Sequence, residues 1–158
     1  ESDKLINLTM LAKEVIENIN FEYKNIKTHN IEVNLEAEPN INFFGYESQL
    51  KSALENILRN AMKYGPKNSH ILFKISKKEQ AIDISITDEG AGVNQSDAEK
   101  IFEPFHRTFQ ANIENEEGSG LGLAIAKEAV ELNKGRIKAI TTDKDFTVKI
   151  TLPKKKIK

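Results

Sequence analysis

Residues 47–64 decide the fold and read ESQLKSALENILRNAMKY. Apolar residues recur in this stretch at steps of three and four, the spacing of one face of an α-helix. Gly65 and Pro66 follow and are typical of a helix end. The sequence therefore predicts an amphipathic helix over residues 47–64, whose core-facing stripe is Leu50, Ala53, Leu54, Ile57, Leu58, Ala61 and Met62.

The polar face of this predicted helix carries Asn56, Asn60 and Lys63. Spacings of four and three place the three side chains on one face. Asparagine has a lower helix propensity than Glu, Lys or Gln, which are more favourable on a helix face that is only solvated. Two amide oxygens one turn apart, with an ammonium beyond them, suit a hydrated Mg²⁺ and the phosphates it bridges. An ordinary wet face is the alternative interpretation of these residues taken alone.

The rest of the chain alternates between strand and helix patterns. Apolar steps of three and four predict helices over residues 8–26 and 123–134, the second ended by Gly135. Alternating or short apolar runs predict strands over residues 31–36, 41–44, 70–77, 81–88, 136–142 and 146–152. Helices interspersed with hairpin-paired strands favour an α/β (α+β) two-layer sandwich, with helices backing a mixed, mostly antiparallel sheet.

Composition limits the class of protein. The chain has 158 residues, of which 39% are hydrophobic and 30% charged, which predicts one compact domain over residues 1–153 and a basic tail over 154–158. A cysteine count of 0 excludes disulfides, thiolate metal sites and a cysteine nucleophile. The net charge of −1 and the lack of a bilayer-length apolar run disfavour nucleic acid and membrane as partners. The missing N-terminal methionine leads us to expect a soluble piece cut from a longer chain.

Glycines gather at the two ends of a long polar stretch between residues 90 and 122. Such a stretch is too long for an idle connection. Glycine allows main-chain amides to approach a ligand closely. The sequence therefore predicts a ligand near the five of the 8 glycines that lie there, which are Gly90, Gly92, Gly118, Gly120 and Gly122.

Each glycine cluster has a functional and a structural interpretation. Residues 88–92 (DEGAG) end a predicted strand, so Asp88 can accept from an exocyclic amine such as that of adenine, or the segment is only a Gly-rich turn. Residues 118–123 (GSGLGL) run into a predicted helix, so they form an anion site or only a hinge and cap. There is no P-loop motif, and Gln95 and Ile125 stand where a dinucleotide motif needs its third glycine.

Residues 101–107 (IFEPFHR) lie within the long stretch. Phe102 and Phe105, on either side of Pro104, can pin the segment to an apolar surface. Arg107 could reach phosphate oxygens. Pinning and phosphate contact are compatible.

In their order and spacing, these four motifs resemble those of the catalytic, ATP-binding domain of sensor histidine kinases, within the superfamily that also holds gyrase, Hsp90 and MutL ATPases. The N box of that family matches residues 55–64, the G1 box 88–92, the F box 102–107 and the G2 box 118–123. Each motif is weak by itself, whereas the ordered set is specific. The resemblance covers essentially the whole chain.

The resemblance implies that ATP lies between the N-box helix and a long ATP lid, from about residue 93 to residue 119. It implies that Asn60 is the Mg²⁺ ligand, that Asn56 and Lys63 approach the phosphates, and that Tyr64 lies near the nucleotide. The other implied contacts are Asp88 to the adenine amine, Gly90, Gly92 and Val93 along the ring, Arg107 to the terminal phosphate, and Gly118, Ser119, Gly120, Leu121, Gly122 and Leu123 around the remaining phosphates.

The resemblance also implies phosphoryl transfer. Hydrolysing relatives carry a general-base glutamate where Asn56 stands, so transfer is expected here rather than hydrolysis. A smaller departure is Glu117, where many members have glycine. The family's acceptor histidine lies on a separate dimerisation domain, and none of His29, His70 and His106 resembles it.

We therefore expect a catalytic fragment of a two-component sensor kinase. Its partners would be the dimerisation domain of the same parent and, indirectly, a response regulator. It would be a cytoplasmic domain of a membrane-bound bacterial sensor. The alternatives are a stand-alone anti-sigma-factor-type serine kinase and a non-catalytic nucleotide-binding module.

Overall fold

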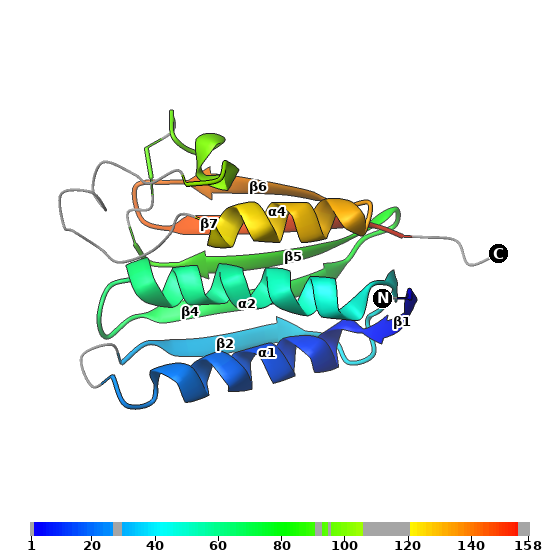
Figure 1. The fold of residues 1–158 in the computed structure, drawn as a ribbon. Helices are drawn as coiled ribbons and strands as arrows, with labels where there is room; N and C mark the ends of the chain where they lie inside the picture. Colours follow the sequence, from blue (N-terminus) through cyan, green and yellow to red (C-terminus); the bar gives the residue numbers. More distant parts are fainter. Residues whose placement is uncertain (1, 27–29, 91–92, 95, 106–120, 155–158) are drawn as a thin grey trace.

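The protein is described by a computed structural model over residues 2–26, 30–90, 93–94, 96–105 and 121–154. The fold has two layers, with α1 (Leu8–Tyr23), α2 (Glu47–Tyr64) and α4 (Gly122–Leu132) side by side on one face of a sheet (Figure 1). A short 3₁₀-helix, η1 (Lys100–Phe102), lies beside α4. The predicted helix over 47–64 is confirmed at both ends.

The main sheet has five strands in the order β2-β4-β5-β7-β6. The pairing of β2 with β4 is parallel, and the other three pairings are antiparallel, which confirms the mixed, mostly antiparallel sheet. Two further strands, β1 and β3, pair antiparallel in a small separate sheet. The strands are β1 (Lys4–Asn7), β2 (Glu32–Ala37), β3 (Asn42–Gly45), β4 (His70–Lys77), β5 (Ala81–Asp88), β6 (Arg136–Thr141) and β7 (Phe146–Pro153).

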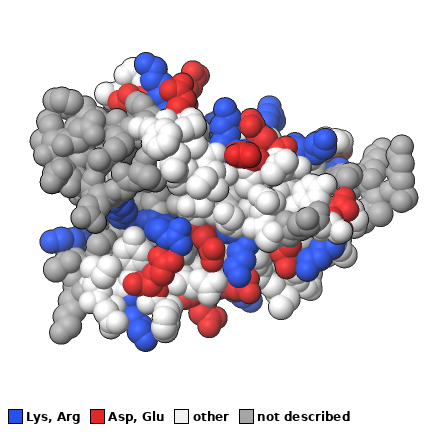
Figure 2. All heavy atoms as spheres, in the orientation of Figure 1, with Lys and Arg blue, Asp and Glu red and all other residues white. Residues whose placement is uncertain are grey.

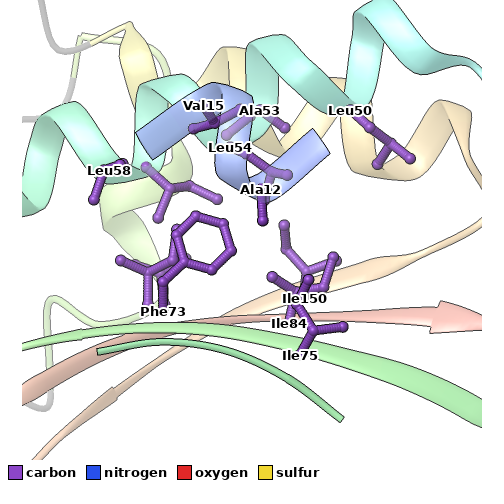
Figure 3. Packing of buried hydrophobic residues seen from close by; sticks show 14 of the residues in the cluster. Ala12, Val15, Leu50, Ala53, Leu54, Leu58, Phe73, Ile75, Ile84 and Ile150 are labelled. Atoms are coloured by element: carbon purple, nitrogen blue, oxygen red, sulfur yellow. The ribbon is translucent and has the colours of Figure 1, made fainter. Parts of the chain in front are cut away.

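The core lies between the helices and the sheet (Figure 3). Alternate residues of β4, β5 and β7 are buried, as the period of two in a strand requires when one face is covered. Every residue of the predicted α2 stripe is buried. Figure 3 shows side chains of α1 and α2, such as Val15 and Leu54, pointing toward Phe73, Ile84 and Ile150 of the strands. This packing fixes α2 over the centre of the sheet.

Helix α1 is shorter than predicted. It begins where the Asn7 side chain accepts a hydrogen bond from the Met10 amide at 3.0 Å, which is an N-cap. It ends at Tyr23, and the amide of Ile26 bonds back to the Tyr23 carbonyl in a turn. Ile26 is exposed, so burial does not extend the helix to it.

Helices α1 and α2 run parallel and are joined by three polar contacts, each between residues 37 apart in sequence. Such exposed pairs contribute about 0–1 kcal/mol each. They nevertheless align three successive turns of α1 with three turns of α2. The contacts are Glu14 with Lys51 at 3.3 Å, Asn18 with Glu55 at 3.1 Å, and Glu22 with Arg59 at 3.0 and 2.7 Å.

The two aromatics of the F box differ in their surroundings. Ile101 and Phe102 of η1 are buried in the core, so pinning of the segment by Phe102 is confirmed. Phe105 is 71% exposed, so its predicted share in pinning is wrong. The physical reason is that η1 ends at Phe102 and the extended backbone at Glu103 leads residues 103–105 into solvent.

Charges of both signs are interspersed on the face seen in Figure 2. Among the described residues, no helix has both the length and the apolar character that a bilayer crossing requires. Strand β7 ends at Pro153, while residues 155–158 lie outside the described residues, so the boundary between domain and tail stays a prediction.

Candidate functional site

Three of the four motifs meet along the second half of α2, since β5 ends beside the end of α2 and α4 begins beside Asn56. A Cβ built on Gly65, the residue after α2, would lie 3.6 Å from the Cβ of Asp88. A Cβ built on Gly90 would lie 3.2 Å from the Tyr64 carbonyl oxygen, and one built on Gly122 would lie 3.3 Å from the Asn56 Oδ1. The fold thus joins residues that are far apart in the sequence.

The Asn56 amide has a defined orientation. Its Nδ2 donates to the Ser52 carbonyl, one turn earlier on α2, at 2.9 Å. With the nitrogen held there, Oδ1 lies next to Gly122 at the start of α4. Ser52 is a residue that the motifs did not identify, although its position four residues before Asn56 is the signal that could have found it.

The side chains of Asn60 and Lys63 follow along the same helix and are half-buried. In the part of the chain that the structure describes, no hydrogen bond engages the Asn60 side chain, so its amide oxygen is available to a ligand. The Lys63 Nζ lies 5.3 Å from the centre of the Tyr64 ring, within the range of a cation–π contact. Tyr64 is 42% exposed and therefore presents part of its ring to solvent.

Asp88 is a buried carboxylate at the end of β5 and is only 3% exposed. Burial raises the pKa of Asp88 to about 6, and the nearby carboxylate of Asp145 adds to the rise. The Gly90 amide donates to Asp88 Oδ1 at 2.8 Å, which opposes the rise in pKa. A buried carboxylate of this kind gains from any further donor that a ligand brings.

Glycine is required at position 90. An added Cβ would lie 2.8 Å from Asp88 Oδ1 and 3.2 Å from the Tyr64 carbonyl oxygen. A side chain at this position would therefore push the carboxylate away from its donor. The lack of a Cβ lets this segment pack closely against the end of α2, and its approach to a ligand stays a prediction.

Helix α4 begins at Gly122, one residue earlier than predicted, and no side chain at its N-cap residue, Leu121, caps the helix. Because Gly122 lies next to Asn56, the positive end of the α4 dipole lies beside Asn56. Uncapped amides at a helix N-terminus suit an anion. Leu123 and Val93 are half-buried and pack against the core. Whether they face a ligand stays a prediction.

The far end of α4 is fixed by Asn133, a buried residue that the motifs missed. Its Nδ2 donates to the Ala129 carbonyl at 2.9 Å, and its Oδ1 accepts from the Tyr46 amide, just before α2, at 2.8 Å. Asn133 therefore holds α4 against α2 at the end opposite Gly122.

Five predicted site residues lie outside the described residues, as does most of the predicted lid. These residues are Gly92, Arg107, Gly118, Ser119 and Gly120.

Comparisons with known proteins agree with this arrangement. Residues 45–156 match the family described as histidine kinase-, DNA gyrase B- and HSP90-like ATPase. The sensor histidine kinase WalK of Bacillus subtilis (strain 168) is 40% identical over 112 residues, which are 69% of this chain and 18% of WalK. The sensor histidine kinase CpxA of Escherichia coli (strain K12) is 37% identical over 134 residues, which are 85% of this chain and 28% of CpxA.

The solved catalytic domain of the histidine kinase ThkA, in a nucleotide-free form, has the same fold. Its TM-score is 0.84 at 22% identity, over 98% of this chain and 97% of that one. The chain spans less than a third of WalK and of CpxA, so it corresponds to one part of such proteins. The chain belongs to the histidine kinase-, DNA gyrase B- and HSP90-like ATPase family, as a catalytic, ATP-binding domain of the sensor histidine kinase type.

Proposed function

We propose that this chain binds ATP with Mg²⁺ between α2, the end of β5 and the start of α4, and transfers the γ-phosphoryl group to a histidine on a separate dimerisation domain. The observation that carries the proposal is that two pairs lie along α2, Asn56 with Gly122 and, at the end of the helix, Asp88 with Gly90. These pairs supply an amide, a buried carboxylate and backbone without side chains, which are the groups that a purine triphosphate needs.

The purine end of the site rests on Asp88. Its carboxylate accepts from the exocyclic amine of adenine, and this added donor offsets the unfavourable burial that raises the pKa. Gly90, Gly92 and Val93 lie along the ring. Tyr64 lies beside the nucleotide, where its exposed ring supports the position of Lys63.

The phosphate end rests on α2 and α4. Among the residues that the structure describes, the Asn60 amide oxygen has no hydrogen-bond partner, which fits a Mg²⁺ ligand. When bound, Mg²⁺ supplies charge neutralisation between phosphate oxygens. Asn56, Lys63 and Arg107 contact the phosphates, and the backbone of residues 118–123 surrounds them at the positive end of α4.

Transfer is favoured over hydrolysis because of the chemistry of Asn56. An amide cannot take a proton from water, so the site lacks a general base at this position. An external histidine nitrogen attacks the γ-phosphorus, a nitrogen–phosphorus bond forms, and the bond to the β–γ bridging oxygen breaks to release ADP. Lys63 and Arg107 stabilise the charge on the phosphoryl oxygens.

The partners follow from this reaction. A dimerisation domain of the parent supplies the histidine, and a response regulator receives the phosphoryl group afterwards. Kinases of this fold have been solved as full-length ShkA with AMPPNP and as ThkA with the response regulator TrrA.

The names of the relatives favour a histidine kinase over a serine kinase of the anti-sigma-factor type or a non-catalytic module. We place the domain on the cytoplasmic side of a membrane-bound sensor.

Replacement of Asn60 tests the proposal. Asn60→Ala should abolish most of the Mg²⁺-dependent part of ATP affinity and lower the rate of transfer to an added dimerisation domain by about 10² to 10³. Asn60→Asp should retain metal binding, because a carboxylate is also a Mg²⁺ ligand. Isothermal titration with and without Mg²⁺ measures affinity, and mass spectrometry detects phosphohistidine.

The matched control is Asn42→Ala, which removes an exposed asparagine of β3 and should change neither quantity. Equal Mg²⁺-dependent affinity and transfer in Asn60→Ala and the original protein would remove Asn60 from the site. Stoichiometric phosphohistidine on this chain alone, without the dimerisation domain, would refute an external acceptor.

A further inference from the structure

We propose that the free edge of β2 is a docking site for an extended segment of a partner protein, which adds to the sheet as a further strand and carries alternating basic and apolar side chains. The proposal does not depend on nucleotide binding, since β2 lies at the edge of the sheet and the nucleotide contacts lie on α2, β5 and α4 (Figure 1).

Within the described ranges, the backbone groups on the outer side of β2 have no strand partner. The Glu32 amide donates to the Ser69 carbonyl at 3.1 Å, on the side of β4. Peptide groups of alternate residues point to opposite sides of a strand, so those of Val33 and Leu35 point away from the sheet. Among the described residues, β4 alone pairs with β2. An added strand would therefore find a ready template.

The two edges of the sheet differ in their protection. Edge strands are usually protected by charged side chains, especially lysine, by proline or by a bulge. The other edge strand, β6, carries Arg136 and Lys138. Strand β2 contains no lysine, arginine or proline, and it pairs with β4 without a bulge from Glu32 to Ala37. It remains competent to pair with another chain.

A groove lies beside this edge, between α1 and β2. Its volume is about 580 Å³, and it is open to solvent. The side chains of Val33 and Leu35 are half-buried and form part of its floor. Alternate apolar side chains of an added strand would fill it. Its lining is Ile16, Val33, Leu35, Ala37 and Pro39, with Thr9, Lys13, Glu17 and Asn20.

The charge of the other face of β2 selects the partner. Glu32 and Glu36 are exposed and stand on the same face, four residues apart. Their neighbours on β4 are exposed side chains: the Lys74 Nζ lies 3.7 Å from Glu36, and the His70 Nε2 lies 4.0 Å from Glu32. Such pairs exchange at little cost. Basic residues at alternate positions of the added strand would complement these carboxylates.

The same charges oppose a second copy of this chain as the occupant. A twofold antiparallel pairing centred on Asn34 would set Glu32 opposite Glu36 of the other copy. Like charges directly opposite each other are destabilising. In this register the carboxylates disfavour self-association and favour a basic strand.

A capped heptapeptide of alternating lysine and valine (KVKVKVK) tests the proposal with the whole chain. In low salt, we expect saturable binding by isothermal titration, with amide shifts confined to β2 and α1. The double substitution Glu32→Gln and Glu36→Gln should weaken binding about tenfold. The control, Glu79→Gln with Asp143→Asn, removes two exposed carboxylates elsewhere and should leave affinity unchanged.

Three results would overturn the proposal. The first is equal binding of the same peptide when its backbone is N-methylated throughout, which would show attraction by charge without strand addition. The second is equal binding of a glutamate–valine peptide, which would show no selection of basic residues. The third is a dimer of the chain alone in sedimentation that becomes tighter in the Glu32→Gln, Glu36→Gln variant, as relief of the carboxylate repulsion requires, which would assign the edge to a second copy.

Discussion

At the scale of single residues, burial of the Asp88 carboxylate lowers the stability of the ligand-free fold at neutral pH, while the same carboxylate is the proposed acceptor for adenine. Burial raises its pKa from the ordinary 3.8 to about 6. The folded protein therefore binds more protons than the unfolded chain between these two values, and stability falls as the pH rises through that window. A carboxylate that destabilises the ligand-free fold at neutral pH is expected where function needs the charge.

Asp88→Asn should therefore stabilise the ligand-free protein at pH 8 and weaken ATP binding. The asparagine cannot ionise, so we expect the free energy of unfolding to increase by about 1–3 kcal/mol at pH 8 and to change little near pH 3.5. Denaturant titrations at the two pH values measure this. ATP affinity of the original protein should also fall as the pH drops below 6.

Nucleotide protonation affects both proteins equally, so the ratio of their ATP affinities isolates Asp88. That ratio should shrink as the pH falls through about 6. A ratio that stays constant from pH 5 to pH 8, or equal destabilisation by Asp88→Asn at both pH values, would contradict the role of a buried ionised Asp88.

At the scale of elements, the contact between α2 and α4 sets the geometry of the phosphate end. Helix α4 begins at Gly122, next to Asn56 Oδ1, and its C-cap residue Asn133 lies next to Tyr46. The two helices run antiparallel between these points (Figure 1). Anything that separates them at Gly122 would displace the Asn56 amide from its position beside the start of α4.

Gly122→Ala should lower the affinity for ATP without lowering the thermal stability of the fold. Alanine favours a helix over glycine by about 0.5–1 kcal/mol, so the melting temperature should stay equal or rise. The new Cβ would lie 3.3 Å from Asn56 Oδ1, closer than an ordinary contact, so ATP affinity should fall several-fold. Glu128→Ala, on an exposed position of α4, is the control and should keep full affinity. Unchanged affinity in Gly122→Ala would show that this contact has no part in nucleotide binding.

At the scale of the whole molecule, local patterns were sufficient for most elements. The ranges of α2, β4 and β5 agree with the predicted ranges because each has a strong period and a clear stop. Strand β1, only four residues long, has no such pattern and is formed by its pairing with β3. The parallel pairing of β2 with β4 joins residues that are 38 apart in the sequence. The residue pattern of either strand does not predict which strand it pairs with or in which direction.

The candidate site was predictable in its residue types and less so in its contacts. Asn56, Asp88 and the glycines stand out in the sequence because they are unusual at those positions. The burial that raises the pKa of Asp88, and the Ser52 carbonyl that orients Asn56, depend on packing between distant segments. Those features emerge only when the helices lie on the sheet.

A crystal structure of this chain with a non-hydrolysable ATP analogue and Mg²⁺ tests the central claim most directly. We predict the adenine amine within hydrogen-bonding distance of the Asp88 carboxylate, the metal on the Asn60 amide oxygen, and the phosphates at the start of α4. A nucleotide bound elsewhere, for instance in the groove between α1 and β2, with Asp88 and Asn60 contacting only protein atoms, would contradict it.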